Sequence, residues 1–253
     1  MRNKQRVVGV IPSRWASTRL PGKPLALIAG KPMIQRVAER VVQANSLDAV
    51  LVATDDPRIA DAVASFAIPG VEAVMTRVDH PSGTDRIAEA IADTDCDVVI
   101  NVQGDEPLMD PKLIDQLADV MTSGDWDMAT AAAPIDNEAD LKSPDVVKAV
   151  FADDGQALYF SRAPIPHVRD AGTDATGAHW RHIGIYAYRR DYLLKLVAEP
   201  PCALENFEKL EQLRALHIGC RMNVLRVNDI GIGVDTPEDI KKVERILKEQ
   251  GDD

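Results

Sequence analysis

Residues 7–24 read VVGVIPSRWASTRLPGKP. The first five form a short run of apolar and small residues that ends at Pro12, a pattern typical of a buried strand. The remainder contains Pro, Gly and three cations, Arg14, Arg19 and Lys23, but no acid. The stretch therefore predicts a buried strand that leads directly into a long cationic loop.

Further along the first half of the chain, strand-like and helix-like segments alternate. Apolar runs predict the strands, and helical spacing or an Asp/Thr-Pro start predicts the helices. The expected strands are 7–11, 49–53, 71–75 and 97–102, and the expected helices are 33–44, 57–67, 84–92 and 111–121. Such alternation is typical of a parallel sheet with helices on both faces.

The second half is less regular. Strands are expected at 146–150, 157–160, 183–188 and 222–227, and amphipathic helices at 204–216 and 237–249. Asp235 or Thr236 is the expected cap of the last helix. Residues 161–181 lack periodicity, which is typical of a functional loop. No linker is evident, so a single mixed α/β domain is predicted.

The charge of the chain is unevenly distributed. The 253 residues contain 29 Lys and Arg and 40 Asp and Glu, for a net charge of −11. Residues 1–38 nevertheless hold eight basic residues and no acid (Arg2, Lys4, Arg6, Arg14, Arg19, Lys23, Lys31 and Arg36). The acidic total argues against binding to nucleic acid or an anionic membrane. The basic segment favours a small anionic ligand, although a basic terminus without a role is an equal alternative on charge alone.

The three cysteines, Cys96, Cys202 and Cys220, are far apart in the sequence. Because no C-x-x-C pair occurs, neither a zinc knuckle nor a disulfide framework is expected. The apolar run at 7–11 is too short for a signal-peptide core or a membrane span. We therefore expect a cytoplasmic protein.

Polar residues follow two of the expected strands, where ligands bind to parallel sheets. Arg14, Arg19 and Lys23 suit a polyphosphate, although the loop matches neither a Walker A nor a G-x-G-x-x-G motif. After the fourth strand, Asp105 and Glu106 suit Mg²⁺, with helix capping as an equally good alternative. For Asp235, capping of the last helix is the better local interpretation.

Taken together, these segments resemble a known family. Residues 11–25 closely resemble the signature loop of the 3-deoxy-manno-octulosonate (Kdo) cytidylyltransferases. The resemblance continues in TRVDHPSGT (76–84), NVQGDEP (101–107), LYFSR (158–162), RHIGIY (181–186), LEQLR (210–214) and GVDTPED (233–239). It therefore covers nearly the whole chain.

The resemblance implies a fold and a reaction. The implied fold is a Rossmann-like nucleotidyltransferase fold of the GT-A type, with a mixed, mostly parallel sheet and helices on both faces. Residues 1–253 would form one domain, with 1–135 as the nucleotide-binding half and 136–253 as the sugar-binding and dimerisation half. The implied reaction joins CMP from CTP to the anomeric hydroxyl of Kdo by Mg²⁺-assisted in-line attack, with release of pyrophosphate, for lipopolysaccharide biosynthesis.

The resemblance also implies roles for individual residues. Nucleotide binding falls to Arg14, Ser17, Arg19, Lys23, Ser82, Gly83, Gln103 and Asp105. Catalysis falls to Arg14, Lys23, Asp105 and Asp235, with Asp105 and Asp235 as the Mg²⁺ ligands. Sugar binding falls to Gln103, Arg162, Arg169, His182, Tyr186, Glu211 and Gln212. One departure concerns the sugar side: His167 stands where many relatives have Trp.

The partners implied are CTP, Kdo and a second copy of the chain in a homodimer. Helix 204–216 and strand 183–188 are the candidate interface elements, although amphipathicity alone is more typical of core packing. Three other functions remain open. The first is a cytidylyltransferase for 8-amino-Kdo or a sialic-type acid. The second is a non-catalytic CTP-binding module, which would need the cations but not two carboxylates. The third is a GT-A glycosyltransferase, which would release no pyrophosphate from CTP.

Overall fold

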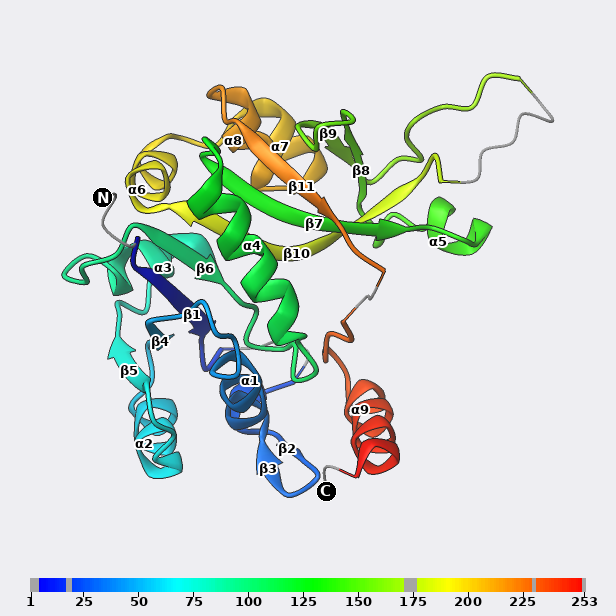
Figure 1. The fold of residues 1–253 in the computed structure, drawn as a ribbon. Coiled ribbons are helices and arrows are strands. Elements are labelled where there is room, and N and C mark those ends of the chain that lie inside the picture. The colour runs from blue at the N-terminus through cyan, green and yellow to red at the C-terminus, as the bar shows by residue number, and fades with distance from the viewer. Residues whose placement is uncertain (1–4, 17–19, 171–176, 229–230, 252–253) are drawn as a thin grey trace.

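The computed structural model describes residues 5–16, 20–170, 177–228 and 231–251. The strands of the main sheet are β1 Val7–Ser13, β4 Ala49–Thr54, β5 Val71–Met75, β6 Val98–Asn101, β7 Met128–Pro134, β8 Lys148–Phe151, β9 Ala157–Ser161, β10 Trp180–Arg189 and β11 Met222–Arg226. They lie in the order β11-β7-β10-β6-β1-β4-β5, with β8 paired to β10 and β9 paired to β8 (Figure 1). A separate small hairpin joins β2 Leu27–Ile28 to β3 Lys31–Pro32.

Most neighbouring strands along this order are parallel. β1 pairs in parallel with β4 and β6, β4 with β5, and β7 with β11. β10 is antiparallel to both of its neighbours, β6 and β7. The mixed, mostly parallel sheet is thus confirmed. Strand 183–188 is part of β10, in the middle of the sheet, and its expected role at a dimer interface stays a prediction.

Helices cover both faces of the sheet. Their bounds are α1 Met33–Val41, α2 Pro57–Phe66, α3 Gly83–Ala90, α4 Pro111–Ser123, α5 Glu138–Lys142, α6 Arg190–Ala198, α7 Ala203–Glu208, α8 Gln212–His217 and α9 Pro237–Gln250, with a 3₁₀ helix, η1, at Lys23–Leu25. Successive side chains of a strand point to opposite faces. In β1, Val7 and Ile11 accordingly join the core that contains residues of α1, α2, α4 and α9, whereas Val8 and Val10 join the core that contains residues of α3, α6 and α8.

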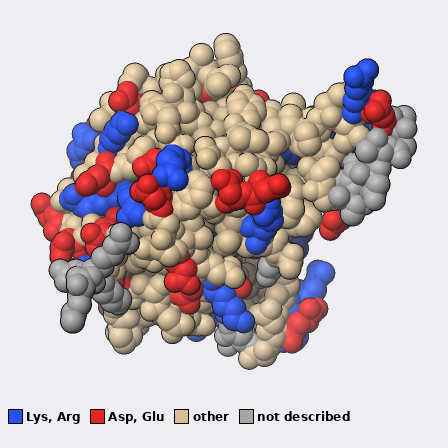
Figure 2. Space-filling view, turned by 45° about the horizontal axis from the view of Figure 1, so that its top comes forward, with Lys and Arg blue, Asp and Glu red and all other residues tan. Residues whose placement is uncertain are grey.

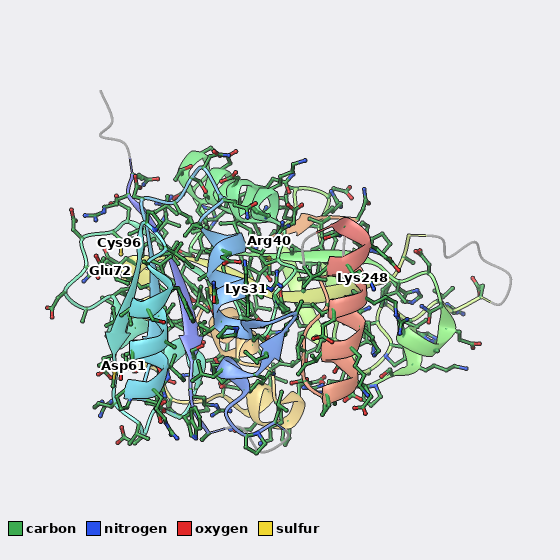
Figure 3. All side chains as sticks on the ribbon, turned by 90° about the horizontal axis from the view of Figure 1, so that it is seen from below. Lys31, Arg40, Asp61, Glu72, Cys96 and Lys248 are labelled. Atoms are coloured by element: carbon green, nitrogen blue, oxygen red, sulfur yellow. The ribbon has the colours of Figure 1, made fainter. Side chains whose placement is uncertain are left out.

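Seen from below, α1, α2 and α9 lie on the near side of the molecule, and the β2–β3 hairpin with Lys31 lies between α1 and α9 (Figure 3). Two contacts join the hairpin to these helices. The amide of Ala29 donates to Oε1 of Glu244 in α9 at 3.0 Å, and the amine of Lys31 bonds the carboxylate of Glu39 in α1. The last helix is thereby held beside the segment that follows the cationic loop.

Several elements differ from expectation. β7, α5 and α6 were not expected, and the single helix expected at 204–216 is wrong, because α7 and α8 are separated at Lys209, which has φ 54°. β1 also continues through Pro12 to Ser13 instead of ending at Pro12. The missing N–H of Pro12 breaks no sheet hydrogen bond, since pairing with β6 ends at Val10.

No helix among the described residues combines the length and apolar composition needed to cross a membrane. All three cysteines are buried and free.

Candidate active site

The carboxyl ends of β1 and β6 come unusually close together. A Cβ atom at Gly104, in the loop after β6, would lie 2.8 Å from the carbonyl oxygen of Pro12 and 3.0 Å from Oγ of Ser13. A side chain at this position would therefore collide with the end of β1. This close approach, not a special backbone angle, explains the glycine, and it brings the cationic loop next to Asp105.

A cavity of about 440 Å³ opens at these strand ends, and we call it the first cavity. It is lined by Pro12, Ser13, Arg14, Ala16, Lys23, Pro24, His80, Pro81, Ser82, Gly83, Arg86, Gln103, Gly104, Asp105, Glu211 and Asp235. The lining thus brings together residues from the cationic loop, the 76–84 segment, the loop after β6 and the segment before α9. Ser17 and Arg19 lie outside the described residues.

Lys23 is held between the two expected metal ligands. Its Nζ donates to Oδ2 of Asp105 at 2.6 Å and to Oδ1 of Asp235 at 2.9 Å. Lys23 begins η1 directly after Gly22, whose φ of +66° is in the left-handed region that glycine favours. Asp235 is placed by its neighbour, because the amide of Val234 donates to the carbonyl of Asp105 at 2.8 Å. Residues far apart in the sequence thus form one charged centre.

The capping alternatives for these acids are wrong. Thr236 caps α9, in a capping box with Asp239, and Asp110 caps α4. The carboxylates of Asp105 and Asp235 instead turn toward the first cavity. Oε2 of Glu106 is buried, and burial together with the charge of Asp105 raises the pKa of Glu106 to about 7.

The donor set at this centre fits Mg²⁺. Two carboxylates already converge on one positive charge, the ammonium of Lys23. Mg²⁺ is commonly held by one or two carboxylates, with water and substrate phosphates completing its octahedron. In the part of the chain that the structure describes, no group of three or more His, Cys, Asp or Glu side chains forms a closed metal cage. Asp105 and Asp235 form an open site with two carboxylates, which is the arrangement that commonly holds Mg²⁺.

The cationic loop is anchored by residues that the sequence analysis did not single out. The amide of Trp15 donates to Oδ1 of Asp55 at 3.2 Å, and Nη2 of Arg86 donates to Oδ2 of the same carboxylate at 3.0 Å. The guanidinium of Arg58 lies 3.4 Å from the centre of the Trp15 ring. The available signal was the position of Asp55 directly after β4, where a carboxylate also reaches the ligand edge of the sheet.

The segment before α3 forms another wall of the first cavity. Oγ of Ser82 accepts hydrogen bonds from the amides of Thr84 and Asp85 and so caps α3. The Ser82 hydroxyl also donates to Oδ2 of Asp85 at 2.7 Å. The imidazole of His80 contacts the carboxylate of Glu89. These bonds fix the wall that carries Ser82 and Gly83, two of the expected nucleotide-binding residues.

A second cavity of about 250 Å³ adjoins the first and shares Gly83, Gln103 and Glu211 with it. Tyr186 and Gln212, both expected at the sugar, line it as well. Three buried polar atoms in its lining have no hydrogen-bond partner within the described structure, namely Oδ1 of Asn101, Nε2 of Gln212 and Nε of Arg214. Because buried polar groups are normally paired, these atoms indicate a polar ligand.

His182 and Tyr186 lie next to each other on β10, with ring centres 5.4 Å apart. Nε2 of His182 bonds the hydroxyl of Thr130 at 2.9 Å. Burial lowers the pKa of His182 to about 4 and raises the pKa of Tyr186 well above its usual value. Both side chains are therefore uncharged near neutral pH and offer hydrogen bonds but no charge.

The two expected sugar-binding arginines line neither of these cavities. Nε of Arg162 donates to the carbonyl of Glu208 at 2.7 Å, and its Nη1 donates to the carbonyl of Pro144 at 2.8 Å. Arg169 and His167 are exposed in the segment after β9. The structure thus gathers Gln103, Tyr186, Glu211 and Gln212 at the second cavity and leaves both arginines outside it.

Comparison with known proteins places this geometry in context. A family model described as Cytidylyltransferase matches residues 8–230. The chain is 49% identical over 249 residues to the 3-deoxy-manno-octulosonate cytidylyltransferase of Syntrophotalea carbinolica, covering 96% of this chain and 98% of that one. It is 50% identical over 244 residues to the protein of the same name from Alcanivorax borkumensis, covering 92% and 95%.

Among solved structures, a CMP:2-keto-3-deoxy-manno-octonic acid synthetase complexed with CTP matches with a TM-score of 0.91 and 43% identity, over 97% of this chain and 99% of that one. A 4-diphosphocytidyl-2C-methyl-D-erythritol synthase from Anaerococcus prevotii matches with a TM-score of 0.66 and 13% identity, over 97% of this chain and 100% of that one. The latter likeness concerns the fold alone.

Proposed function

Because this chain belongs to the family of 3-deoxy-manno-octulosonate cytidylyltransferases, we propose that it transfers CMP from CTP to the anomeric hydroxyl of Kdo and releases pyrophosphate. The observation that carries the proposal is the meeting of Lys23, Asp105 and Asp235 in a cavity that opens onto a second, polar cavity. CMP-Kdo is the activated sugar for lipopolysaccharide biosynthesis, which is the role that follows for this chain.

The first cavity is the proposed CTP site. Arg14 and Lys23 neutralise the triphosphate, together with Arg19 and the hydroxyl of Ser17 from the same loop. Ser82 and Gly83 lie against the cytosine, on the wall fixed by the α3 cap. Phosphoryl-type transfer is mainly a matter of positioning and charge neutralisation, which this cationic loop is built to supply.

Asp105 and Asp235 are the proposed ligands of Mg²⁺. When bound, the metal neutralises the α-phosphate and favours ionisation of the attacking sugar hydroxyl. Lys23 donates to both of these carboxylates. With a metal bound there, its ammonium would be available to neutralise the triphosphate.

The second cavity is the proposed Kdo site. Amide, phenol and carboxylate groups of Gln103, Tyr186, Glu211 and Gln212 suit the many hydroxyls of this sugar. Gln103 is oriented by donation from its Nε2 to the carbonyl of Gly184 at 3.0 Å. His182 supports the ring of Tyr186 without adding charge. Arg162 and Arg169 remain the proposed cations for the sugar carboxylate.

The protein is further proposed to act as a homodimer in the cytoplasm. A surface over β9 and α7 exposes Leu158, Leu204 and Phe207, and we call it the α7–β9 surface. Figure 2, which turns the top of the molecule toward the viewer, shows a broad area near the top without Lys, Arg, Asp or Glu. Large apolar side chains exposed on one surface favour association. Three free cysteines suit a reducing compartment.

A panel of sugars tests the proposed reaction. The protein is incubated with CTP, Mg²⁺ and either Kdo, 8-amino-Kdo or a sialic acid, and pyrophosphate release is followed. We expect the highest kcat/KM with Kdo and no pyrophosphate without sugar. Turnover of the amino analogue but not of Kdo would overturn the substrate, and CTP binding without turnover of any sugar would favour a non-catalytic module.

A further inference from the structure

One hydrogen bond joins α3, whose cap forms a wall of the first cavity, to the residue before α8 that lies at the junction of the two cavities. Oγ1 of Thr84 donates to Oε2 of Glu211 at 2.7 Å, across 127 positions of sequence. Thr84 lies in the first turn of α3, two residues after the Ser82 cap, and Glu211 lies directly before α8. Glu211 lines both cavities, whereas Thr84 lines only the second. The carboxylate at the junction is thus held by a residue of α3.

The surroundings of Thr84 make this bond hard to replace. Thr84 is 9% exposed, so water has little access to its hydroxyl. Tyr188 and Asn101 line the second cavity together with Thr84, and both are buried. Neither Thr84, Tyr188 nor Asn101 carries a formal charge that could hold Glu211 in its place. The hydroxyl of Thr84 therefore supplies the directional contact to this carboxylate.

The geometry points to Thr84 as a positioning residue for sugar binding, acting through Glu211. By holding the carboxylate at the junction, Thr84 aims it at a sugar hydroxyl beside the triphosphate. The inference rests on the proposed function, because it takes Glu211 as a sugar ligand. It adds that recognition of the sugar depends on a residue of α3, the helix whose cap forms a wall of the first cavity.

The test replaces Thr84 with valine, which keeps the shape of the side chain but cannot donate. Hydrogen bonds to charged groups contribute enough that losing one changes an affinity by roughly tenfold or more. For Thr84→Val we expect KM for Kdo to rise by about tenfold, with the Kd for CTP, measured by calorimetry, within about twofold of the parent value. Thr84→Ser, which restores the hydroxyl, is expected to recover most of the loss.

A matched control and a double-mutant cycle separate positioning from general destabilisation. Thr122 in α4 donates its hydroxyl to the carbonyl of Ala118, and neither residue lines either cavity, so Thr122→Val measures the general cost of the same change. If Thr84 acts through Glu211, then Thr84→Val should add almost nothing to the KM for Kdo in a Glu211→Ala background.

Three results would overturn the inference. The first is an unchanged KM for Kdo in Thr84→Val. The second is a full additive effect in the Glu211→Ala background. The third is a loss of CTP affinity and of thermal stability equal to the loss of Kdo affinity, which would make Thr84 a purely structural residue. If the unmodified protein released no pyrophosphate with Kdo, the proposed function itself would fail and the inference with it.

Discussion

At the scale of single residues, the charged centre of the first cavity depends on groups whose local sequence favours other roles. Asp235 lies beside an excellent helix cap, and capping was the better local interpretation until the structure gave that role to Thr236. Its contact with Lys23 spans 212 positions of sequence. Local sequence patterns cannot predict a contact between residues so far apart. The roles of the cationic loop and of Asp105 could be predicted because each follows a strand.

Removing either carboxylate tests the metal assignment. We expect Asp105→Asn or Asp235→Asn to lower kcat by at least about a hundredfold, because a neutral amide weakens the electrostatic stabilisation of the reacting phosphate. CTP should still bind, since Arg14 and Lys23 remain. Pyrophosphate release and CTP calorimetry measure the two effects. Asp61→Asn, on α2 (Figure 3), is the matched control. Near-normal turnover in either active-site variant would remove that residue from the metal site.

The buried imidazole of His182 predicts a loss of stability in acid. Burial lowers its pKa from 6.5 to about 4. In the unfolded chain the imidazole is therefore protonated below about pH 6.5, whereas in the folded chain it stays neutral down to about pH 4. The free energy of unfolding should therefore fall as the pH drops through this window, by up to about 3 kcal/mol from this group.

The measurement compares urea unfolding of the protein and of His182→Gln between pH 7 and pH 4. We expect a shallower acid loss in the variant than in the parent. His217→Gln, at an exposed position of α8, controls for the removal of an imidazole. Parallel pH profiles for parent and His182→Gln would show that the buried imidazole is not responsible.

At the scale of elements, prediction from sequence succeeded where periodicity was strong and failed where tertiary contacts override it. β7 reads MATAAAP, and alanine has a low β-propensity, yet this strand is buried between β10 and β11. The expected helix 204–216 failed at Lys209. The break there turns Glu205 inward to bond Arg214 and leaves Leu204 and Phe207 on the surface.

The end of α2 offers a prediction about local stability. Ala67 closes this helix with φ 50°, in the left-handed region that costs an L-residue roughly 1 kcal/mol relative to glycine. Ala67→Gly should therefore raise the stability by about 1 kcal/mol, or about 2–4 °C in Tm. Ala64→Gly, at an exposed position inside the same helix, should lower Tm by a similar amount. Thermal unfolding would contradict the prediction if both variants were destabilised alike.

At the scale of the whole molecule, the order of the elements along the chain could be predicted better than their roles in forming the two cavities. Alternation of strands and helices in the first half predicted the parallel part of the sheet and therefore the edge at which ligands bind. β7, β10 and β11 extend the sheet beyond β6, and residues of β7 and β10 line the second cavity. Glu211 and Gln212 line the second cavity because the helix breaks at Lys209. Helical periodicity in the sequence does not predict this break.

The same break creates the apolar α7–β9 surface and so predicts assembly. Phe207 is 83% exposed, Leu158 58% and Leu204 43%, and the hydroxyl of Ser161 in β9 donates to Glu208 of α7 at 2.6 Å, which holds the two elements together. A second copy of the chain covering this surface would bury all three side chains. Light scattering should then give about twice the 27.6 kDa mass of one chain.

Phe207→Ser should weaken this association at least tenfold, because burying a phenylalanine contributes about 2–3 kcal/mol. Leu27→Ser is the matched control, since Leu27 is 60% exposed but lies on the β2–β3 hairpin, at the opposite end of the molecule from α7 (Figure 1). A parent protein that remains at the mass of one chain at high concentration would refute the dimer. Equal weakening by both variants would place the interface elsewhere. Because α8 follows α7 directly, a dimer formed through α7 would also stiffen the helix that carries Gln212 into the second cavity.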